Sequence, residues 1–362
     1  SSQPRSINHT QREAVGPLRP GESRRGRRVV THRAQTPLLR VLTSAAAVRA
    51  AHAAYPAWSR TSYTERAAKL NEVADYLEAG QDDVDQRARL FCREHGKPIK
   101  ETHLEVSRLG DRFRTTAAYA DRLARDEIEH GPPFDTIITR QPRGVATLIV
   151  PWNWPLSILG AKLPQALMAG NTVVVKPSEL STLTPSMTLQ RIAEMFPPGV
   201  INIVTGDATK IGDFLVGHPL VRFVNFTGSV RIGKHVMKVA ADKLTPVTLE
   251  LGGNDPAIIC ADARLDEKAF MNMYLGTFMS SGQICMALKR LYVHRSRYDE
   301  VIEGLSAVCN RMVVGDGLLP DTNMGPVNNA RQLEPVAHMS GQARASGAEV
   351  RACGRVRDEA RY

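Results

Sequence analysis

Hydrophobic and polar residues follow two different patterns along the chain, and the change falls after residue 126. Before it the spacing is helical, with apolar residues at i, i+3, i+4 and i+7: Leu70, Val73, Ala74 and Leu77. Ser62-Tyr-Thr-Glu65 precedes this face and has the pattern of a capping box, in which the two outer side chains satisfy free N–H groups at a helix start. Further helices are expected over 44–55, 84–94 and 99–126.

After residue 143, short β-branched runs alternate with helical segments. The runs are Val145–Val150, Thr172–Val175, Val200–Val204, Val221–Phe226 and Thr245–Leu249. Near-continuous apolar strands separated by helices are typical of a parallel sheet with helices on both faces. The sequence therefore predicts an α/β fold.

Two smaller patterns flank this sheet. Thr136–Gln141 follows the breaker Gly131-Pro-Pro, so we expect it to pair with a neighbour as a protruding hairpin. After Gly253 a second β/α run is expected, with strands near 256–260 and 289–294 and helices near 264–279 and 297–310. The length of 362 residues suits about two to three domains.

Charge is spread unevenly along the chain. The formal net charge is +10, and residues 1–40 carry +7 of it through nine arginines and only two glutamates. We interpret this segment as a disordered tail, with an organelle transit segment or a non-native start, since the chain opens on Ser1, as alternatives. The remaining residues carry only +3, so we expect no nucleic-acid partner. Nucleic-acid binding through the arginine-rich tail is kept as a third hypothesis.

The rest of the composition is that of a globular protein, 43% hydrophobic and 23% charged. No apolar run reaches the roughly 18 residues that a membrane helix needs, so no membrane partner is expected. The cysteines are odd in number, far apart and without CxxC spacing: Cys92, Cys260, Cys285, Cys309 and Cys353. This argues against a disulfide framework and a zinc site, and we expect a reducing, cytoplasmic location and no metal.

Pro151-Trp-Asn-Trp-Pro155 directly follows the first strand of the predicted sheet. Ligands bind at the carboxyl ends of strands in an open α/β sheet, and the Asn153 side-chain amide there could donate a hydrogen bond to a developing oxyanion. The alternative is a proline-bracketed turn whose tryptophans only pack.

Lys176 and Glu179 lie three residues apart after the next strand, where both could reach one ribose. A glutamate at such a position binds ribose hydroxyls and repels a 2′-phosphate, which favours NAD over NADP. A solvated charged turn is the alternative.

Phe226-Thr-Gly-Ser229 and Gly233 lie between a predicted strand and a predicted helix. Gly228 permits close backbone approach, and the helix start near Ser229 offers free N–H groups to a pyrophosphate. The GxGxxG spacing of the commoner dinucleotide fingerprint is missing, so the motif is weak by itself.

Two reactive side chains complete the series. Glu250-Leu-Gly-Gly253 places a carboxylate at a strand end before two glycines, as a mobile general base or as a capping acid. Gly282-Gln-Ile-Cys285 places a thiol near a loop-to-helix junction, where backbone N–H groups could stabilise the thiolate. A buried structural cysteine is the alternative for Cys285.

The order of these five motifs is rare, with Cys285 lying 35 residues after Glu250. Through PWNWP, KPSE, FTGS, ELGG and GQIC in this order, the chain resembles the NAD(P)-dependent aldehyde dehydrogenase superfamily from about Ala46 to Arg355. The resemblance implies a Rossmann-type parallel-sheet domain, a second α/β catalytic domain and a β-hairpin arm for oligomerisation. It also implies NAD-dependent oxidation of a small aldehyde to a carboxylic acid.

The resemblance assigns the chemistry to three residues. Cys285 would attack the aldehyde carbonyl, and the Asn153 side chain together with the Cys285 N–H would hold the oxyanion. Glu250 would activate the water that hydrolyses the thioester, which favours the hydrolytic over the CoA-acylating branch. Lys162 matches a family lysine near the active site.

A further set of residues would contact or frame NAD by the same resemblance: Ile149, Trp152, Lys176, Glu179, Gly228, Ser229, Gly233 and Leu251. Lys176 and Glu179 would bind the adenosine ribose, and Ser229 would bind the pyrophosphate. NADP is the less expected cofactor.

The implied organisation has four parts. They are a basic leader over 1–43, a dinucleotide-binding domain over 44–123 and 143–252, an oligomerisation hairpin over 124–142 and a partial catalytic domain over 253–362. Residues 1–40 do not resemble the family's N-terminal strands, and the segment with a Glu-x-Phe motif that grips the nicotinamide ribose in the family would lie beyond Tyr362. We therefore keep two main hypotheses: an active enzyme that forms homo-oligomers if complete, and a truncated, silent chain that at most binds NAD or a longer paralogue.

Overall fold

The computed structural model describes residues 37–351 and 353–357, with side chains from residue 43 onward. Helix α1 (Pro37–Trp58) begins within the predicted leader 1–43 and contains the helix predicted over 44–55. The predicted disorder of the leader otherwise lies outside the described residues.

Five helices follow α1 before the first strand: α2 (Tyr63–Glu78), α3 (Gln81–His95), α4 (Ile99–Ser107), α5 (Leu109–Ala117) and α6 (Ala120–Ala124). The predicted capping box is confirmed, because Ser62 Oγ accepts the Glu65 N–H at 3.1 Å and Glu65 accepts the Ser62 N–H at 2.7 Å. The helical character predicted over 99–126 is confirmed, but the stretch is not one continuous helix. It is divided because α4 packs on α3 and α7, whereas α5 turns its apolar face toward α2.

The predicted parallel sheet is confirmed. Its strands are β3 (Val145–Ile149), β4 (Thr172–Lys176), β5 (Ile201–Ile203), β6 (Val221–Thr227) and β7 (Val247–Glu250), in the spatial order β5-β4-β3-β6-β7. The helices between them are α7 (Pro155–Gly160), α8 (Leu163–Met168), α9 (Leu183–Ala193), α10 (Ala208–Gly217) and α11 (Val230–Ala241). All four strand pairings are parallel, as the apolar runs separated by helices predict.

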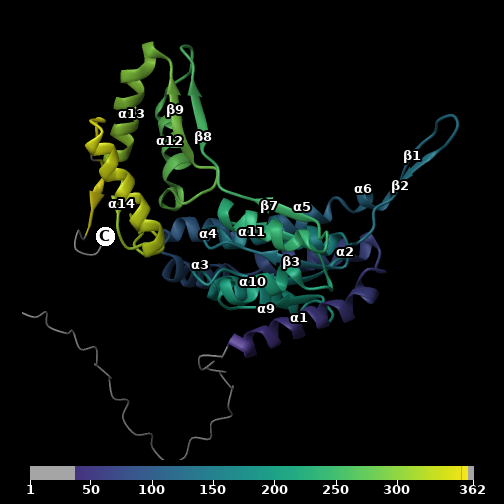
Figure 1. Cartoon of the computed structure of the whole chain (residues 1–362). Helices are drawn as coiled ribbons and strands as arrows, with labels where there is room; N and C mark the ends of the chain where they lie inside the picture. Colours follow the sequence, from purple (N-terminus) through teal and green to yellow (C-terminus); the bar gives the residue numbers. More distant parts are fainter. Residues whose placement is uncertain (1–36, 352, 358–362) are drawn as a thin grey trace, which may run out of the picture. The chain divides into compact units, whose positions relative to one another are not determined.

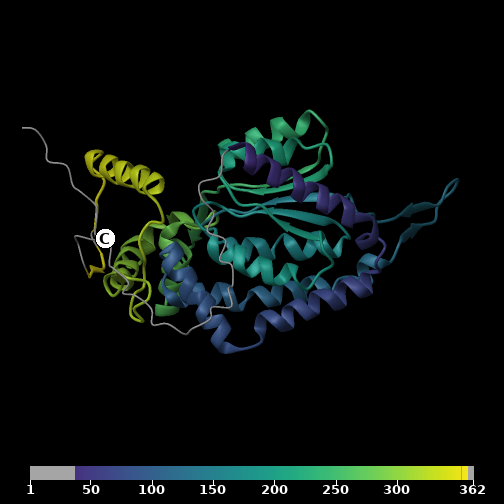
Figure 2. The ribbon, with the colours of Figure 1, turned by 90° about the horizontal axis from the view of Figure 1, so that it is seen from below.

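Both faces of this sheet are buried at its centre, and successive residues of β4 show how. Val174 belongs to an apolar cluster with α1, α10 and α11. Val173 and Val175 belong to a second cluster with α2, α5 and α8 on the opposite face. Figure 2 shows α1 crossing the sheet on one side and the α2 region lying on the other. A strand covered on both faces has no polar side to expose, which explains the continuous apolar runs.

The strand order reverses between β3 and β6. The chain runs from β3 outward to β4 and β5, and then returns past β3 to build β6 and β7 on the other side. The segments that follow β3 and β6 therefore diverge at the carboxyl edge of the sheet. Open α/β sheets bind their ligands at the point where the strand order reverses in this way.

The predicted hairpin is confirmed as an antiparallel pair, β1 (Glu127–Glu129) with β2 (Thr136–Ile138). Figure 1 shows it projecting away from the five-stranded sheet. Ile128, Phe134 and Ile137 are all exposed on it.

The second β/α run is also confirmed to within a few residues. It holds β8 (Asp255–Ile259), α12 (Glu267–Phe278), a 3₁₀ turn (Met279–Gly282), β9 (Leu288–Val293), a 3₁₀ turn (Arg295–Arg297), α13 (Tyr298–Asn310), β10 (Val313–Val314), α14 (Ala330–Ala345) and β11 (Arg355–Val356). β8 pairs with β9 and β10 pairs with β11, both in parallel. Across the described part of the chain, no helix combines the length and the apolar character needed to cross a membrane.

Candidate active site

The carboxyl edge of the five-stranded sheet carries most of the residues predicted for the site. They lie at or just after the ends of four strands: Ile149, Trp152 and Asn153 with β3, Lys176 and Glu179 with β4, Gly228 and Ser229 with β6, and Glu250 and Leu251 with β7. The parallel register places Ile149 beside Lys176 on one side and beside Phe226 on the other. Gly233 lies in the first turn of α11, which follows β6.

Cys285 comes from the second β/α run, and hydrogen bonds bring its segment to this edge. The Asn153 side chain donates from Nδ2 to the Gln283 carbonyl oxygen at 2.8 Å, across 130 residues of sequence. The Gly253 N–H, three residues after Glu250, donates to the Cys285 carbonyl at 3.2 Å. Cys285 itself is exposed. The predicted amide, carboxylate and cysteine segments thus meet in one region.

The turn before Cys285 has an uncommon backbone conformation. Ser280, Ser281 and Gly282 have φ values of 54°, 57° and 73°. The left-handed region costs a residue other than glycine about 1–2 kcal/mol. Hydrogen bonds hold the turn, because Ser280 N–H donates to a Glu101 carboxylate oxygen at 2.9 Å and Ser281 Oγ donates to the Gly325 carbonyl at 2.8 Å. The conformation of the turn is therefore held by residues distant in sequence, Glu101 and Gly325.

The hydrogen bonds of the described residues leave two donors free in the region of Cys285. Among the hydrogen bonds of the described residues, none uses the Cys285 N–H, and the Asn153 amide uses one of its two hydrogens on Gln283. Lys289 Nζ and the Gly253 N–H both donate to the Cys285 carbonyl, at 2.9 and 3.2 Å, and so fix the peptide that follows the thiol. The arrangement can offer one amide N–H and one backbone N–H to an oxygen that bears negative charge.

Lys162 is a buried cation at the same edge. It is 4% exposed, and its ammonium group donates to the Asn225 side-chain oxygen. Burial lowers the pKa of Lys162 to about 8, and the Glu250 carboxylate partly opposes this change. Lys162 therefore lies within electrostatic range of Glu250. Asn225 was not among the predicted site residues.

The segment after β6 fits the phosphates of a dinucleotide. A Cβ at Gly228 would lie 2.5 Å from the Phe226 ring, and one at Gly233 would lie 2.6 Å from the Leu251 side chain. Ser229 caps α11, accepting the Ile232 N–H at 3.4 Å, and is exposed. The two glycines therefore bring the backbone close to its neighbours, beside the N–H groups at the start of a 12-residue helix.

Lys176 and Glu179 form an ion pair after β4. Lys176 Nζ lies 3.1 Å from Glu179 Oε2, with the lysine side chain 2% and the glutamate side chain 47% exposed. The lysine is thus fixed beneath the surface, while the carboxylate is open to a ligand hydroxyl.

The sequence did not reveal a group of charged residues buried beneath this edge. Lys97 Nζ lies 2.7 Å from Glu105 Oε2, and both side chains are fully buried. Lys97 also lies 3.8 Å from the centre of the Trp154 ring. Glu101 is 6% exposed on the same helix as Glu105. The i, i+4 spacing of two glutamates gives no signal for burial, because such pairs usually face solvent.

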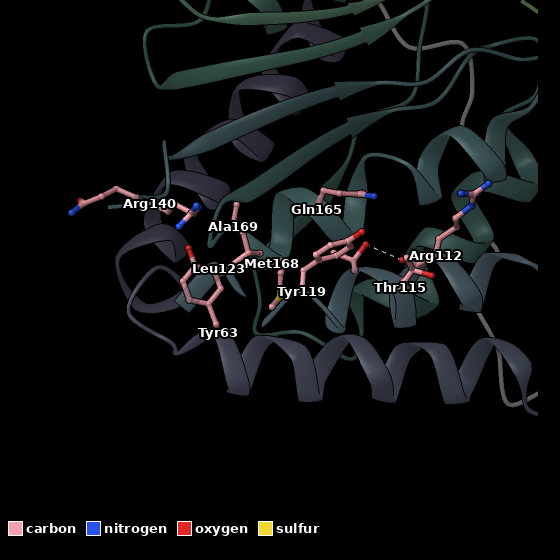
Figure 3. A pocket seen from close by; sticks show the side chains of 11 residues that line it. Tyr63, Arg112, Thr115, Tyr119, Leu123, Arg140, Gln165, Met168 and Ala169 are labelled. Carbon is pink, nitrogen blue, oxygen red and sulfur yellow. Dashed lines mark hydrogen bonds between the residues drawn. The ribbon is translucent and has the colours of Figure 1, made fainter. Parts of the chain in front are cut away.

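A cavity of about 510 Å³ lies away from these residues, and Figure 3 shows its lining, which includes Tyr63, Tyr119, Gln165 and Met168. Gln141 and Ala169, also in its lining, precede β3 and β4 by a few residues, so the cavity adjoins the amino ends of those strands. It is therefore separate from the predicted site. No group of three His, Cys, Asp or Glu residues in the described part of the chain is arranged to hold a metal ion.

Taken with the reversal of strand order and the glycine-framed helix start, the fold is of the doubly wound, Rossmann type. The sequence profile of the aldehyde dehydrogenase family matches residues 31–362. The chain belongs to the aldehyde dehydrogenase family, as its motifs suggested.

Known sequences of the family show how much of the length is shared. Glutarate-semialdehyde dehydrogenase of Pseudomonas putida is 36% identical over 313 residues, which are 86% of this chain and 64% of that protein. The succinate-semialdehyde dehydrogenase [NADP(+)] GabD of Escherichia coli is 36% identical over 312 residues, 85% of this chain and 64% of that one. The chain thus spans less than two thirds of the length of these relatives.

Solved structures confirm the fold. An aldehyde dehydrogenase from Brucella melitensis biovar abortus superposes with a TM-score of 0.81 at 33% identity, over 86% of this chain and 64% of that one. Betaine aldehyde dehydrogenase from Staphylococcus aureus, solved in complex with NAD+, superposes with a TM-score of 0.79 at 31% identity, over 86% and 62%.

Proposed function

We propose that this protein oxidises a small aldehyde to a carboxylic acid with NAD, by covalent catalysis at Cys285. The observation that carries the proposal is the 2.8 Å hydrogen bond from Asn153 to Gln283, because it joins the predicted oxyanion donor to the segment of the predicted nucleophile. Family membership supports the reaction class.

The Cys285 thiolate would attack the aldehyde carbonyl, since a thiolate is nucleophilic near neutral pH and its thioester can be hydrolysed. The charge that develops on the carbonyl oxygen would be held by the free hydrogen of the Asn153 amide and by the Cys285 N–H. One such donor contributes roughly 2.7–4 kcal/mol in comparable sites.

Glu250 would act as the general base that activates water against the thioester. Its exposure at the end of β7 allows water to reach it, and the glycines that follow let the segment move. A general base at this position supports the hydrolytic rather than the CoA-acylating reaction. Lys162 would lower the electrostatic cost of a charged Glu250 between catalytic steps.

The dinucleotide would lie along the carboxyl edge, with its pyrophosphate at the start of α11 between Gly228 and Gly233 and its adenosine ribose on Glu179. Ile149, Trp152 and Leu251 would line the same edge. When bound, the nicotinamide supplies the acceptor for the hydride of the aldehyde. The exposed Glu179 carboxylate supports NAD, because it would repel a 2′-phosphate. The Escherichia coli relative carries NADP(+) in its name, so the preference needs measurement.

The projecting hairpin supports self-association. Ile128, Phe134 and Ile137 are 54%, 80% and 60% exposed, and a second copy of the chain could cover them. A homo-oligomer is therefore part of the proposal.

The proposal is tested by following NADH absorbance with the full chain and a panel of aldehydes. Succinate semialdehyde and glutarate semialdehyde are tested first, because the relatives described above are named for these substrates. We expect turnover that Cys285→Ala abolishes and Cys260→Ala, at another exposed cysteine, does not. Activity that survives Cys285→Ala would exclude the nucleophile, and NAD binding without any turnover would favour the silent chain.

A further inference from the structure

Helix α4 presents two carboxylates to the interior rather than to solvent. Glu101 and Glu105 are one helical turn apart and are 6% and 1% exposed. Buried carboxylates are rare unless they are paired or accept several hydrogen bonds. Each of these two is engaged by a different segment of the candidate site.

Glu105 holds the segment that follows β3. One of its oxygens accepts the N–H groups of Leu156 and Ser157, both at 2.9 Å, and the other accepts Lys97 Nζ at 2.7 Å. The N–H groups belong to the first turn of α7, directly after Asn153 and Trp154. Glu105 thereby fixes where the loop that bears Asn153 ends.

Glu101 holds the segment that precedes Cys285. Its Oε2 accepts the Ser280 N–H at 2.9 Å, 179 residues away in sequence. Ser280 and Ser281 both have left-handed backbone, a conformation that a serine keeps only when its surroundings impose it. The Gln283 side chain donates to the Ser280 carbonyl at 2.8 Å, so the turn passes this restraint on toward Cys285.

The two segments meet beyond the helix, where Asn153 donates to the Gln283 carbonyl. Adjacent turns of one helix thus anchor both sides of the Asn153–Gln283 contact. A change at Glu101 would free one side of it and leave the Glu105 side in place.

We propose that Glu101 is a positioning residue for the Cys285 segment. It holds the left-handed turn at Ser280 so that the Cys285 thiol faces the carbonyl carbon of the substrate while the Asn153 amide faces its oxygen. Glu101 touches neither substrate nor cofactor. The inference rests on the proposed function for its kinetic consequence, but the restraint on the turn can be measured without turnover.

The experiment compares Glu101→Met, which removes the acceptor at similar length, with Glu101→Gln, which keeps a neutral acceptor. Glu94→Met is the matched control, because Glu94 accepts the Thr184 N–H at 2.9 Å at the start of α9, away from the cysteine. Amide hydrogen exchange is measured on the full chain in peptides covering 279–285 and 180–187. Steady-state kinetics with an aldehyde and NAD follow on the same samples.

Glu101→Met should speed exchange over 279–285 roughly tenfold or more and leave 180–187 unchanged, whereas Glu94→Met should do the reverse. The kcat of Glu101→Met should fall about tenfold with KM within about twofold of the wild type, because binding groups are unaffected. At about pH 8.5, where Glu101 is ionised, Glu101→Gln should lie between, with about a threefold change in each, since a neutral acceptor bonds less strongly than a carboxylate. If Glu101→Met does not fold, the exchange and kinetic measurements on Glu101→Gln decide the question.

Unchanged exchange over 279–285 in both Glu101 variants overturns the inference. So does faster exchange with an unchanged kcat in a chain that turns over. If the wild type shows no turnover with any aldehyde, the proposed function fails, and the exchange result alone decides whether Glu101 restrains the turn.

Discussion

The five-stranded sheet and the segment that bears Cys285 are held in place by different forces. All five residues of β4 are buried, and the sheet lies between two large apolar clusters. β8 alternates between partly buried and exposed residues before the buried Ile259. The apolar cluster of the second β/α run has four buried members among the described residues: Phe270, Tyr274, Val308 and Met312. The cysteine segment depends instead on hydrogen bonds: Ser280 donates to Glu101, and Asn153 and Gly253 donate to carbonyl oxygens of the segment.

This difference separates stability from alignment. Residues at strand ends, such as Glu250, are positioned by a register that cannot shift without disrupting an apolar core. The Cys285 segment is positioned by a few polar contacts, whose loss would misalign the thiol while the fold persists. Substitutions in the two regions should therefore give different combinations of lost stability and lost activity.

The largest expected effect is on turnover at Glu250. Glu250→Gln should lower kcat about 10²- to 10⁴-fold, because the amide cannot take a proton from water. Rapid mixing with aldehyde and NAD should still give one equivalent of NADH per chain, since the oxidation precedes hydrolysis. Glu129→Gln, on the hairpin, is the control. If Glu250→Gln keeps the wild-type kcat, Glu250 is not the general base.

A core truncation in the sheet should lower stability and leave turnover nearly unchanged. Leu148→Ala, at a fully buried position of β3, should lower the free energy of unfolding by about 3–5 kcal/mol. Urea denaturation measures this loss, and kcat of the folded fraction should stay within a few-fold of the wild type. Val308→Ala in the smaller cluster should cost less; an equal cost in both places would contradict the contrast between the regions.

Removal of the oxyanion amide should have a slightly smaller effect. Asn153→Ala should lower kcat roughly 10²- to 10³-fold, as for other single oxyanion donors. The melting temperature should change little, because Asn153 is only half-buried and gives up a single hydrogen bond to Gln283. Stopped turnover with a large loss of stability would instead indicate a structural role.

Two buried groups near the Asn153–Gln283 contact should give opposite pH dependences of stability. Burial, helped by Lys97, lowers the pKa of His95 from 6.5 to about 3, so the folded protein binds its proton less readily and loses stability as pH falls below 6.5. Burial raises the pKa of Glu101 from 4.5 to about 7, although the Ser280 N–H and the charges of Lys97 and Lys100 oppose the change. The folded protein therefore gains stability as pH falls from 7 to 4.5.

The two effects should largely cancel in the wild type between pH 6.5 and 5, where each amounts to about 2 kcal/mol. His95→Phe, which keeps an aromatic ring beside Phe91 and Trp152, should gain relative stability toward pH 5, and Glu101→Gln should lose it. Urea denaturation at pH 7 and pH 5 measures both. Parallel pH profiles for the two variants would exclude the assigned titrations.

The smallest expected effect concerns the cofactor. Glu179→Gln should reduce the ratio of kcat/KM with NAD to kcat/KM with NADP roughly tenfold, because the repulsion of a 2′-phosphate is lost. Glu194→Gln, on the surface after α9, is the control. An unchanged ratio would mean that another residue at the carboxyl edge discriminates between NAD and NADP.

The sheet could be predicted from the sequence because its apolar runs record burial on both faces. The motifs after β3, β4, β6 and β7 could be placed at one edge because parallel strands end together. The division of 99–126 into three helices could not, since periodicity does not show that α4 and α5 pack against different partners.

The residues that anchor the Cys285 segment could not be predicted from the sequence either. Glu101 and Ser280 are 179 residues apart, and nothing local to either indicates the other. The acidic residues of α4 look like an ordinary solvated face, and only their packed surroundings distinguish them. The chemistry of the site was therefore easier to foresee than the restraint that aligns it.

The parallel register has a consequence for how such a chain can vary over generations. Thr227 lies opposite Glu250, and a single codon inserted within Val247–Glu250 would turn every later side chain of that strand to the other face. Insertions in the loops at the opposite edge of the sheet would move nothing at this one. Inheritance of the arrangement at this edge thus depends on conserving the number of residues inside each strand, while the connections between strands are free to lengthen.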